Sequence, residues 1–164
     1  MLRNLTPAPD FTLRDEQGHE RSLDDLRAGK PLVIFFFRGA FCPTARKDLL
    51  AYANVYSRIQ ALGAELVAIS VDTPEELHRL RHRLGLEFAL LSDPDFIVSA
   101  RYGVYCSDEV EEGPQPHGEP AIFILDVDGN IAYSQVQSGP KGHANPAEMV
   151  LILLYMKSNG GRYW

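Results

Sequence analysis

One cysteine of this sequence lies where a thiol can become reactive. Cys42 follows the apolar run PLVIFFF (31–37) and precedes Pro43. Proline is favoured at the first position of a helix, so Cys42 should cap a helix N-terminus. Free N–H groups and the positive end of the helix dipole favour a thiolate there, and Arg38 and Arg46 could add positive charge. We therefore predict a reactive nucleophile, in preference to the inert buried thiol that a free cysteine often is.

Three other sets of residues could take part in catalysis or metal binding, but each also has a non-functional interpretation. Cys106 opens an acidic segment rich in Pro and Gly, 105–119, which reads as a loop. It is a candidate resolving thiol or an incidental loop cysteine, and the latter is favoured. His117 could act near the reactive thiol as a base or hydrogen-bond donor, but an exposed loop histidine is the favoured interpretation. His78 and His82 have metal-ligand spacing, yet neighbouring arginines and the lack of a third ligand favour a solvated basic helix face.

The elements that must hold Cys42 alternate between strand and helix. Continuous apolar runs, typical of strands buried on both faces, predict strands at 31–37, 64–71 and 120–126. The expected helices each open at a proline: Pro43, Pro74, Pro94 and Pro146. The residues before the last three, Thr73, Asp93 and Asn145, have side chains that cap free N–H groups. Turn signals predict one hairpin near the start, decorating the sheet, and a second within the sheet at DVDGN (126–130). This order predicts an α/β fold in which helices cover a central sheet.

Composition bounds what the chain can do. Its 164 residues are 45% hydrophobic and 23% charged, which fits one globular domain spanning 1–164. The net charge of −6 provides no basic field for nucleic acid or anionic membranes, so neither is expected as a partner. The longest apolar run is too short to span a bilayer and the start has no signal-peptide pattern, so we expect a soluble cytoplasmic protein. Two cysteines are too few for a disulfide scaffold.

The ordered motifs resemble one known family. The stretch PAPDFTLRDEQGHERSLDDLRAGKPLVIFFFRGAFCPTARKDL looks like the start of the peroxiredoxin-like branch of the alkyl hydroperoxide reductase/thiol-specific antioxidant (AhpC/TSA) family. The similarity continues through ELVAISVDTPEE, LLSDP, ARYGVY, PAIFILDVDGNI and ANPAEMVLILL. The resemblance implies a thioredoxin-like fold, with a central mixed sheet, flanking helices and an N-terminal β-hairpin.

Three departures from that family bear on mechanism. In the usual Pro-x-x-x-Thr-x-x-Cys pattern, Phe35 and Gly39 occupy the Pro and Thr positions of this chain. In the closer branch, Arg-Gly-Gly-Trp-Cys-Pro-x-Cys, the second cysteine is replaced by Ala45, so disulfide reductase chemistry of the thioredoxin type is disfavoured. The family also has an arginine just before the strand predicted here at 120–126. Its position falls near Glu119 and Pro120, and this chain has no arginine there.

The resemblance implies a thiol-dependent peroxidase that reduces hydrogen peroxide or alkyl hydroperoxides, of one-cysteine type, without metal or organic cofactor. A lone thiolate would attack the O–O bond, become a sulfenic acid and be restored by a thiol reductant such as thioredoxin or glutathione. The expected catalytic residues are Cys42, Arg38, Arg46 and Pro120, the last in a cis peptide bond facing the thiol. The expected substrate-binding residues are Gly39, Phe41, Pro43 and Glu119. Homodimers are common in the family. The alternative function is a non-catalytic redox sensor or thiol-binding module, which the missing threonine and arginine motivate.

Overall fold

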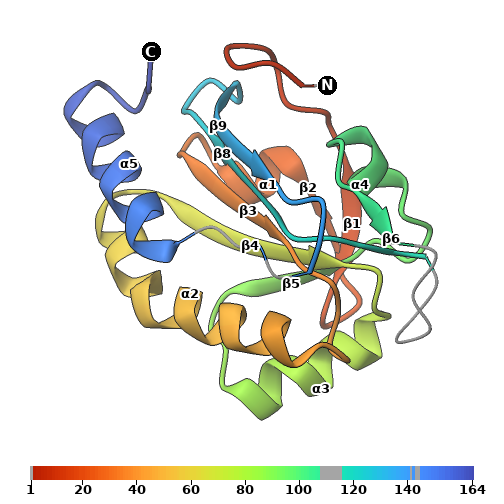
Figure 1. The fold of residues 1–164 in the computed structure, drawn as a ribbon. Helices are drawn as coiled ribbons and strands as arrows, with labels where there is room; N and C mark the ends of the chain where they lie inside the picture. Colours follow the sequence, from red (N-terminus) through yellow and green to blue (C-terminus); the bar gives the residue numbers. More distant parts are fainter. Residues whose placement is uncertain (1, 108–115, 141, 143–144) are drawn as a thin grey trace.

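The protein is built on a seven-stranded mixed sheet with helices on both faces (Figure 1). The computed structural model describes residues 2–107, 116–140, 142 and 145–164. The strand order across the sheet is β2-β1-β5-β4-β3-β8-β9. Its strands are β1 (Thr12–Asp15), β2 (Glu20–Ser22), β3 (Leu32–Phe36), β4 (Glu65–Ser70), β5 (Ala89–Ser92), β8 (Ala121–Leu125) and β9 (Ile131–Val136). The central strands β3, β4 and β5 run parallel, while β8, β9 and the N-terminal hairpin pair antiparallel. The mixed sheet predicted from the family resemblance is confirmed.

The helices divide between the two faces of this sheet. The helices are α1 (Leu23–Arg27), α2 (Pro43–Ala61), α3 (Pro74–Leu84), α4 (Ile97–Arg101) and α5 (Pro146–Ser158). One core cluster joins α2, α3 and α5 to one face of the central strands, and a second joins α1 and α4 to the other face. Side chains alternate along a strand, so Phe35 enters the first cluster while Ile34 and Phe36 enter the second. This explains why β3 reads as an unbroken apolar run.

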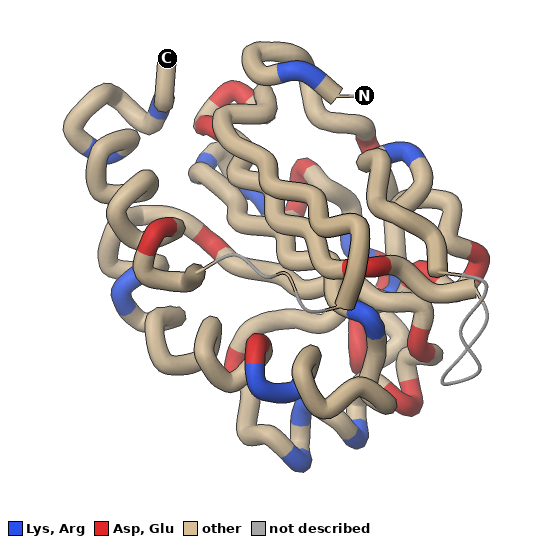
Figure 2. Tube along the Cα trace, in the orientation of Figure 1, with Lys and Arg blue, Asp and Glu red and all other residues tan. Residues whose placement is uncertain are grey.

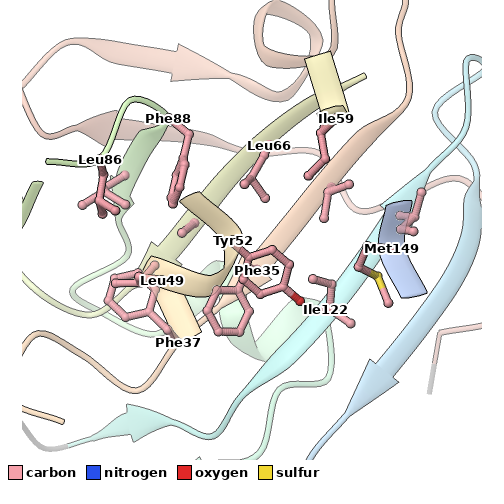
Figure 3. Packing of buried hydrophobic residues seen from close by; sticks show 14 of the residues in the cluster. Phe35, Phe37, Leu49, Tyr52, Ile59, Leu66, Leu86, Phe88, Ile122 and Met149 are labelled. Carbon is pink, nitrogen blue, oxygen red and sulfur yellow. The ribbon is translucent and has the colours of Figure 1, made fainter. Parts of the chain in front are cut away.

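The first core cluster fixes the long helix that carries Cys42 at its start. Leu49, Tyr52 and Ile59 lie on the buried side of α2, and the ring of Tyr52 lies 4.9 Å from that of Phe35 (Figure 3). Burial of a large apolar side chain contributes about 1.5–3 kcal/mol. Because α2 is fixed along its length by such contacts, its first turn is held against the end of β3.

Three predicted details differ in the structure. The N-terminal hairpin does not merely decorate the sheet, because β1 pairs with β5 and extends it. The helix expected to open at Pro94 begins at Ile97 instead, since residues 94–96 form a turn. Asp93 nevertheless caps it: its carboxylate accepts from the backbone N–H groups of Val98 and Ser99. Strand β5 and helix α1 were not predicted, because both are short.

The segment 105–119 was predicted to be a loop, and its ends form a small ribbon. Strand β6 (Cys106–Ser107) pairs antiparallel with β7 (His117–Gly118). Residues 108–115, which hold most of the predicted acidic loop, lie outside the described residues. The ribbon matters for the site because β7 leads directly to Glu119 and the start of β8.

Charged side chains gather away from the centre of the sheet. Figure 2 shows acidic and basic residues over the helices and connections, while β3 and β8 carry none. In the described part of the chain, no helix is both long enough and apolar enough to cross a membrane.

Candidate active site

Cys42 lies at the junction between β3 and α2. It is the N-cap residue of α2, with an extended backbone (φ −91°, ψ 117°), and Pro43 is the first helical residue. Its side chain is 3% exposed and packs within the same core cluster as Phe37 and Ala45. The predicted cap position is confirmed, but the side chain of Cys42 makes no capping hydrogen bond to the helix.

The positive charge beside the thiol comes from Arg38. Nη1 of Arg38 donates to Sγ of Cys42 at 3.3 Å, and both side chains are buried. A buried guanidinium stabilises a nearby anion more strongly than it would in water. From the sequence, the free N–H groups at the start of the helix were expected to favour the thiolate most strongly. The structure assigns the direct contact to Arg38.

Three further groups surround the guanidinium of Arg38. Its Nε lies 3.2 Å from Oε2 of Glu119, an ion pair without hydrogen-bond geometry. Its Nη2 lies 3.3 Å from Nε2 of His117, and its Cζ lies 5.4 Å from the centroid of the Phe41 ring. That ring meets the His117 ring edge to face at 5.1 Å. The favoured interpretation of His117 as an exposed loop residue was wrong, because the side chain is fully buried.

The loop between Arg38 and Cys42 is tied down from two sides. Nη1 of Arg46 donates to the Ala40 carbonyl at 2.7 Å, so this predicted catalytic residue links the first turn of α2 to the loop. Oδ2 of Asp72 accepts from the Ala40 N–H at 2.9 Å and from the Ser70 hydroxyl at 2.6 Å. Burial raises the pKa of Asp72, and the two hydrogen bonds partly oppose that rise. These contacts fix the backbone that leads into Cys42.

Sequence reasoning missed Asp72, although a signal for it exists. Asp72 follows β4 by two residues, and β4 runs parallel to β3. Carboxyl ends of adjacent parallel strands meet at one edge of a sheet, where ligand and catalytic sites form. A polar residue just after the second apolar run was therefore a candidate neighbour of the loop after the first.

Gly39 explains why the usual threonine is absent. Its φ of +144° is strained for a residue with a side chain, and a Cβ there would lie 2.9 Å from Cδ1 of Phe41. It would also approach Oδ2 of Asp72 at 3.4 Å. A threonine would therefore clash with the ring that packs against Arg38.

The remaining predicted site residues lie around this loop. Pro43 is exposed at the start of α2, and Phe41 is half-buried. Pro120 is buried, and its carbonyl accepts from the Gln137 N–H at 2.9 Å. Since Phe36 pairs with Ala121 in the antiparallel register of β3 and β8, Pro120 enters β8 beside the end of β3. A cis bond before Pro120 stays a prediction.

Cys106 has different surroundings from Cys42. It is exposed, and its position in β6 pairs with Gly118, next to His117. Neither cysteine, both within the described residues, forms a disulfide. The described residues include no cluster of His, Cys, Asp and Glu suited to a metal ion, and His78 and His82 are exposed on α3.

Comparisons with known proteins point to one family. A model of the AhpC/TSA family matches residues 5–134. A putative peroxiredoxin of Mycobacterium tuberculosis is 34% identical over 134 residues, covering 80% of this chain and 85% of that protein. A putative peroxiredoxin bcp of Coxiella burnetii is 32% identical over 126 residues, covering 76% of this chain and 82% of that protein.

Solved structures share the fold. The peroxidoxin BcpB of Mycobacterium tuberculosis superposes with a TM-score of 0.79 at 22% identity, covering 94% of this chain and 97% of that chain. A thiol peroxidase from Chromobacterium violaceum gives 0.74 at 26% identity, covering 93% and 87%. The predicted thioredoxin-like fold and thiol-dependent peroxidase function are thereby confirmed, and the alternative of a non-catalytic sensor is not favoured. By the family match and by the identity of its relatives, this chain belongs to the AhpC/TSA family.

Proposed function

We propose that this thiol-dependent peroxidase uses Cys42 as its nucleophile and Arg38 as the donor that activates it. The observation that carries the proposal is the 3.3 Å contact between Nη1 of Arg38 and Sγ of Cys42, inside a buried site. A thiolate, and not a thiol, is the nucleophile, and a neighbouring cation favours it. Arg38 thus takes the place of the family arginine that is missing before β8.

The chemical step follows from these two groups. The Cys42 thiolate attacks the terminal oxygen of a hydroperoxide, so an S–O bond forms while the O–O bond breaks. The terminal oxygen keeps its hydrogen, giving Cys–S–OH, and the other oxygen leaves as hydroxide or alkoxide and takes a proton from solvent. Sulfur is oxidised and the peroxide is reduced. Guanidinium N–H groups of Arg38 beyond those that face Sγ and His117 are available to stabilise the leaving oxygen.

The substrate is proposed to be hydrogen peroxide or an alkyl hydroperoxide. Gly39, Phe41 and Pro43 are proposed to line its path from the loop side, with Glu119 and Pro120 on the strand side. Phe41 would limit water around the thiolate, which strengthens its interaction with Arg38.

The cycle needs an external thiol reductant under this proposal. A reductant thiol condenses with the sulfenic acid to give a mixed disulfide and water, and a second thiol displaces Cys42 as thiolate, leaving the reductant as a disulfide. Cys42 lacks a Cys-x-x-Cys partner, so a one-cysteine cycle with thioredoxin or glutathione is proposed, with Cys106 as the competing resolving thiol. We also propose a single domain over 1–164, a cytoplasmic location and a homodimer.

The test is catalytic turnover combined with identification of the oxidised residue. Consumption of hydrogen peroxide and of an alkyl hydroperoxide is followed with thioredoxin, glutathione or dithiothreitol as reductant. In parallel, a brief exposure to peroxide with a sulfenate trap is read by mass spectrometry. We expect consumption with at least one reductant and the label on Cys42. Consumption with Cys42 unlabelled would refute the assignment, and a Cys42–Cys106 disulfide would replace the one-cysteine cycle by a two-cysteine cycle.

A further inference from the structure

Three groups besides the cysteine contact the guanidinium of Arg38. Nη1 faces Sγ of Cys42, Nε faces the carboxylate of Glu119 at 3.2 Å, and Nη2 faces His117 at 3.3 Å. The Phe41 ring packs against the guanidinium face. Glu119 and His117 come from the segment entering β8, whereas Arg38 and Cys42 come from the loop after β3. Two segments far apart in sequence therefore fix one side chain.

Glu119 supplies a charge that persists when the cysteine loses its own. The thiolate becomes a neutral sulfenic acid during the proposed cycle. A buried guanidinium left without an anion would be strongly destabilised in that state. The Glu119 side chain is itself buried beside Nε, so it gives Arg38 an ionic partner in both oxidation states.

His117 contributes a ring nitrogen that faces the same guanidinium at 3.3 Å. A guanidinium has only donors, so Nε2 of His117 must accept from Nη2 of Arg38. The fully buried ring, in edge contact with Phe41, therefore helps to fix the orientation of the guanidinium plane.

We infer that Glu119 and His117 are positioning residues for the peroxide reaction: together they hold the Arg38 guanidinium so that Nη1 points at Sγ throughout the cycle. This inference rests on the proposed function, because it acts through Arg38 and Cys42. It also gives a role to the segment before β8, where the usual family arginine is absent. Arg38 lies on the loop that carries Cys42, and the two residues that position it lie on the segment before β8.

The experiment compares two reactions of the same sulfur. The rate constant for oxidation of Cys42 by hydrogen peroxide depends on Arg38 placement, whereas alkylation by iodoacetamide at a pH where the thiol is fully ionised reports only access and intrinsic nucleophilicity. The variants are Arg38→Met, Glu119→Ala, His117→Leu and the conservative His117→Gln, whose amide oxygen can still accept from Nη2. His82→Leu, on the exposed face of α3, is the matched control. Far-UV circular dichroism and urea unfolding establish that each variant is folded.

We expect Glu119→Ala and His117→Leu to lower the ratio of peroxide to iodoacetamide rate constants by about 10- to 100-fold, as misplacement of a catalytic group by about 1 Å does. His117→Gln should restore most of the ratio, and His82→Leu should leave it unchanged.

If Arg38→Met lowers the ratio while Glu119→Ala and His117→Leu do not, the positioning inference is wrong and the proposed function stands. If Arg38→Met itself leaves the ratio unchanged, the proposed role of Arg38 fails. Should His117→Leu or Glu119→Ala not fold, His117→Asn and Glu119→Gln are compared in its place, and an unchanged ratio in both would refute the inference.

Discussion

The two cysteines of this chain show how far neighbours decide what a thiol can do. Cys42 caps a 19-residue helix, is buried, and receives a hydrogen bond from a buried arginine. Cys106 is exposed and lies in a two-residue strand of a small ribbon. The two regions meet at β7, where Cys106 pairs with Gly118 and the preceding His117 reaches the arginine beside Cys42.

The two thiols differ in their described neighbours and in burial, although the residue type is the same. The segment after Cys106 is acidic in sequence, with carboxylates at 108, 109, 111 and 112, outside the described residues. Carboxylates near a thiol disfavour its ionised form and a neighbouring cation favours it, and in the structure Arg38 is the cation in contact with Cys42. The same chain thus has one buried thiol that contacts an arginine and one exposed thiol that an acidic stretch follows in the sequence.

Exchange of each cysteine for serine should give the largest contrast. Cys42→Ser removes the nucleophile, so peroxide consumption should fall by more than about 10³-fold, as loss of a catalytic nucleophile does. Cys106→Ser should keep a rate close to that of the unaltered protein with dithiothreitol as reductant. Steady-state peroxide consumption, measured for both variants at equal concentration, tests the contrast. Equal losses in the two variants would mean that Cys106 resolves the sulfenic acid within each turnover.

A smaller effect is expected from loosening the loop that presents Cys42. Asp72→Ala removes the acceptor of the partly buried Ala40 N–H, which should lower the free energy of unfolding by about 1–3 kcal/mol. Because the loop also carries Arg38, oxidation of Cys42 should slow by about tenfold while reactivity of Cys106 stays unchanged. Urea unfolding and separate peptide-level oxidation rates for the two cysteines measure both effects.

Asp95→Ala serves as the control for that change. Asp95 is exposed in the turn before α4, so its loss should alter stability by less than about 0.5 kcal/mol. If Asp72→Ala slows neither cysteine and costs no more stability than Asp95→Ala, the loop does not depend on β4 for its shape.

Much of the fold could be predicted from local patterns. The strands around 32–36, 65–70 and 121–125 are continuous apolar runs, and three helices start at the prolines expected to open them. Strand β5 and helix α1 were missed. Their four and five residues are too few to show a period, and they lack the long apolar run that marks β3 and β8. The start of α4 was misplaced because Phe96 adopts φ +61°, which lengthens the turn after Pro94.

The site was only half predictable for a physical reason. The features of Cys42 are local: a strand end, a cap and a proline within a few residues. The contacts of Arg38 with His117 and Glu119 join residues about eighty positions apart, and only the pairing of β3 with β8 brings them together. From sequence alone, His117 looked like a loop residue because nothing near it signals burial.

The smallest expected effect is a pH dependence confined to the loop of Cys42. Burial raises the pKa of Asp72 above that of an ordinary carboxyl, while hydrogen bonds from Ser70 and Ala40 act against the rise and the nearby Glu76 adds to it. A carboxyl whose pKa is raised by folding binds its proton more tightly in the folded state. Its contribution therefore makes the protein more stable at low pH, and this stability is lost as pH rises from the ordinary value of about 3.9 through the raised pKa of Asp72.

The variant Asp72→Asn isolates this contribution, because it keeps an oxygen acceptor but cannot titrate. We expect the free energy of unfolding of the unaltered protein, minus that of Asp72→Asn, to increase as pH is lowered through this window and to be flat above it. Urea unfolding of both proteins from neutral to acidic pH gives this difference directly, and other carboxyls cancel in it. A difference that decreased on acidification would show that the hydrogen bonds to Asp72 outweigh its burial, and that the loop leading into Cys42 is held by an ionised carboxylate.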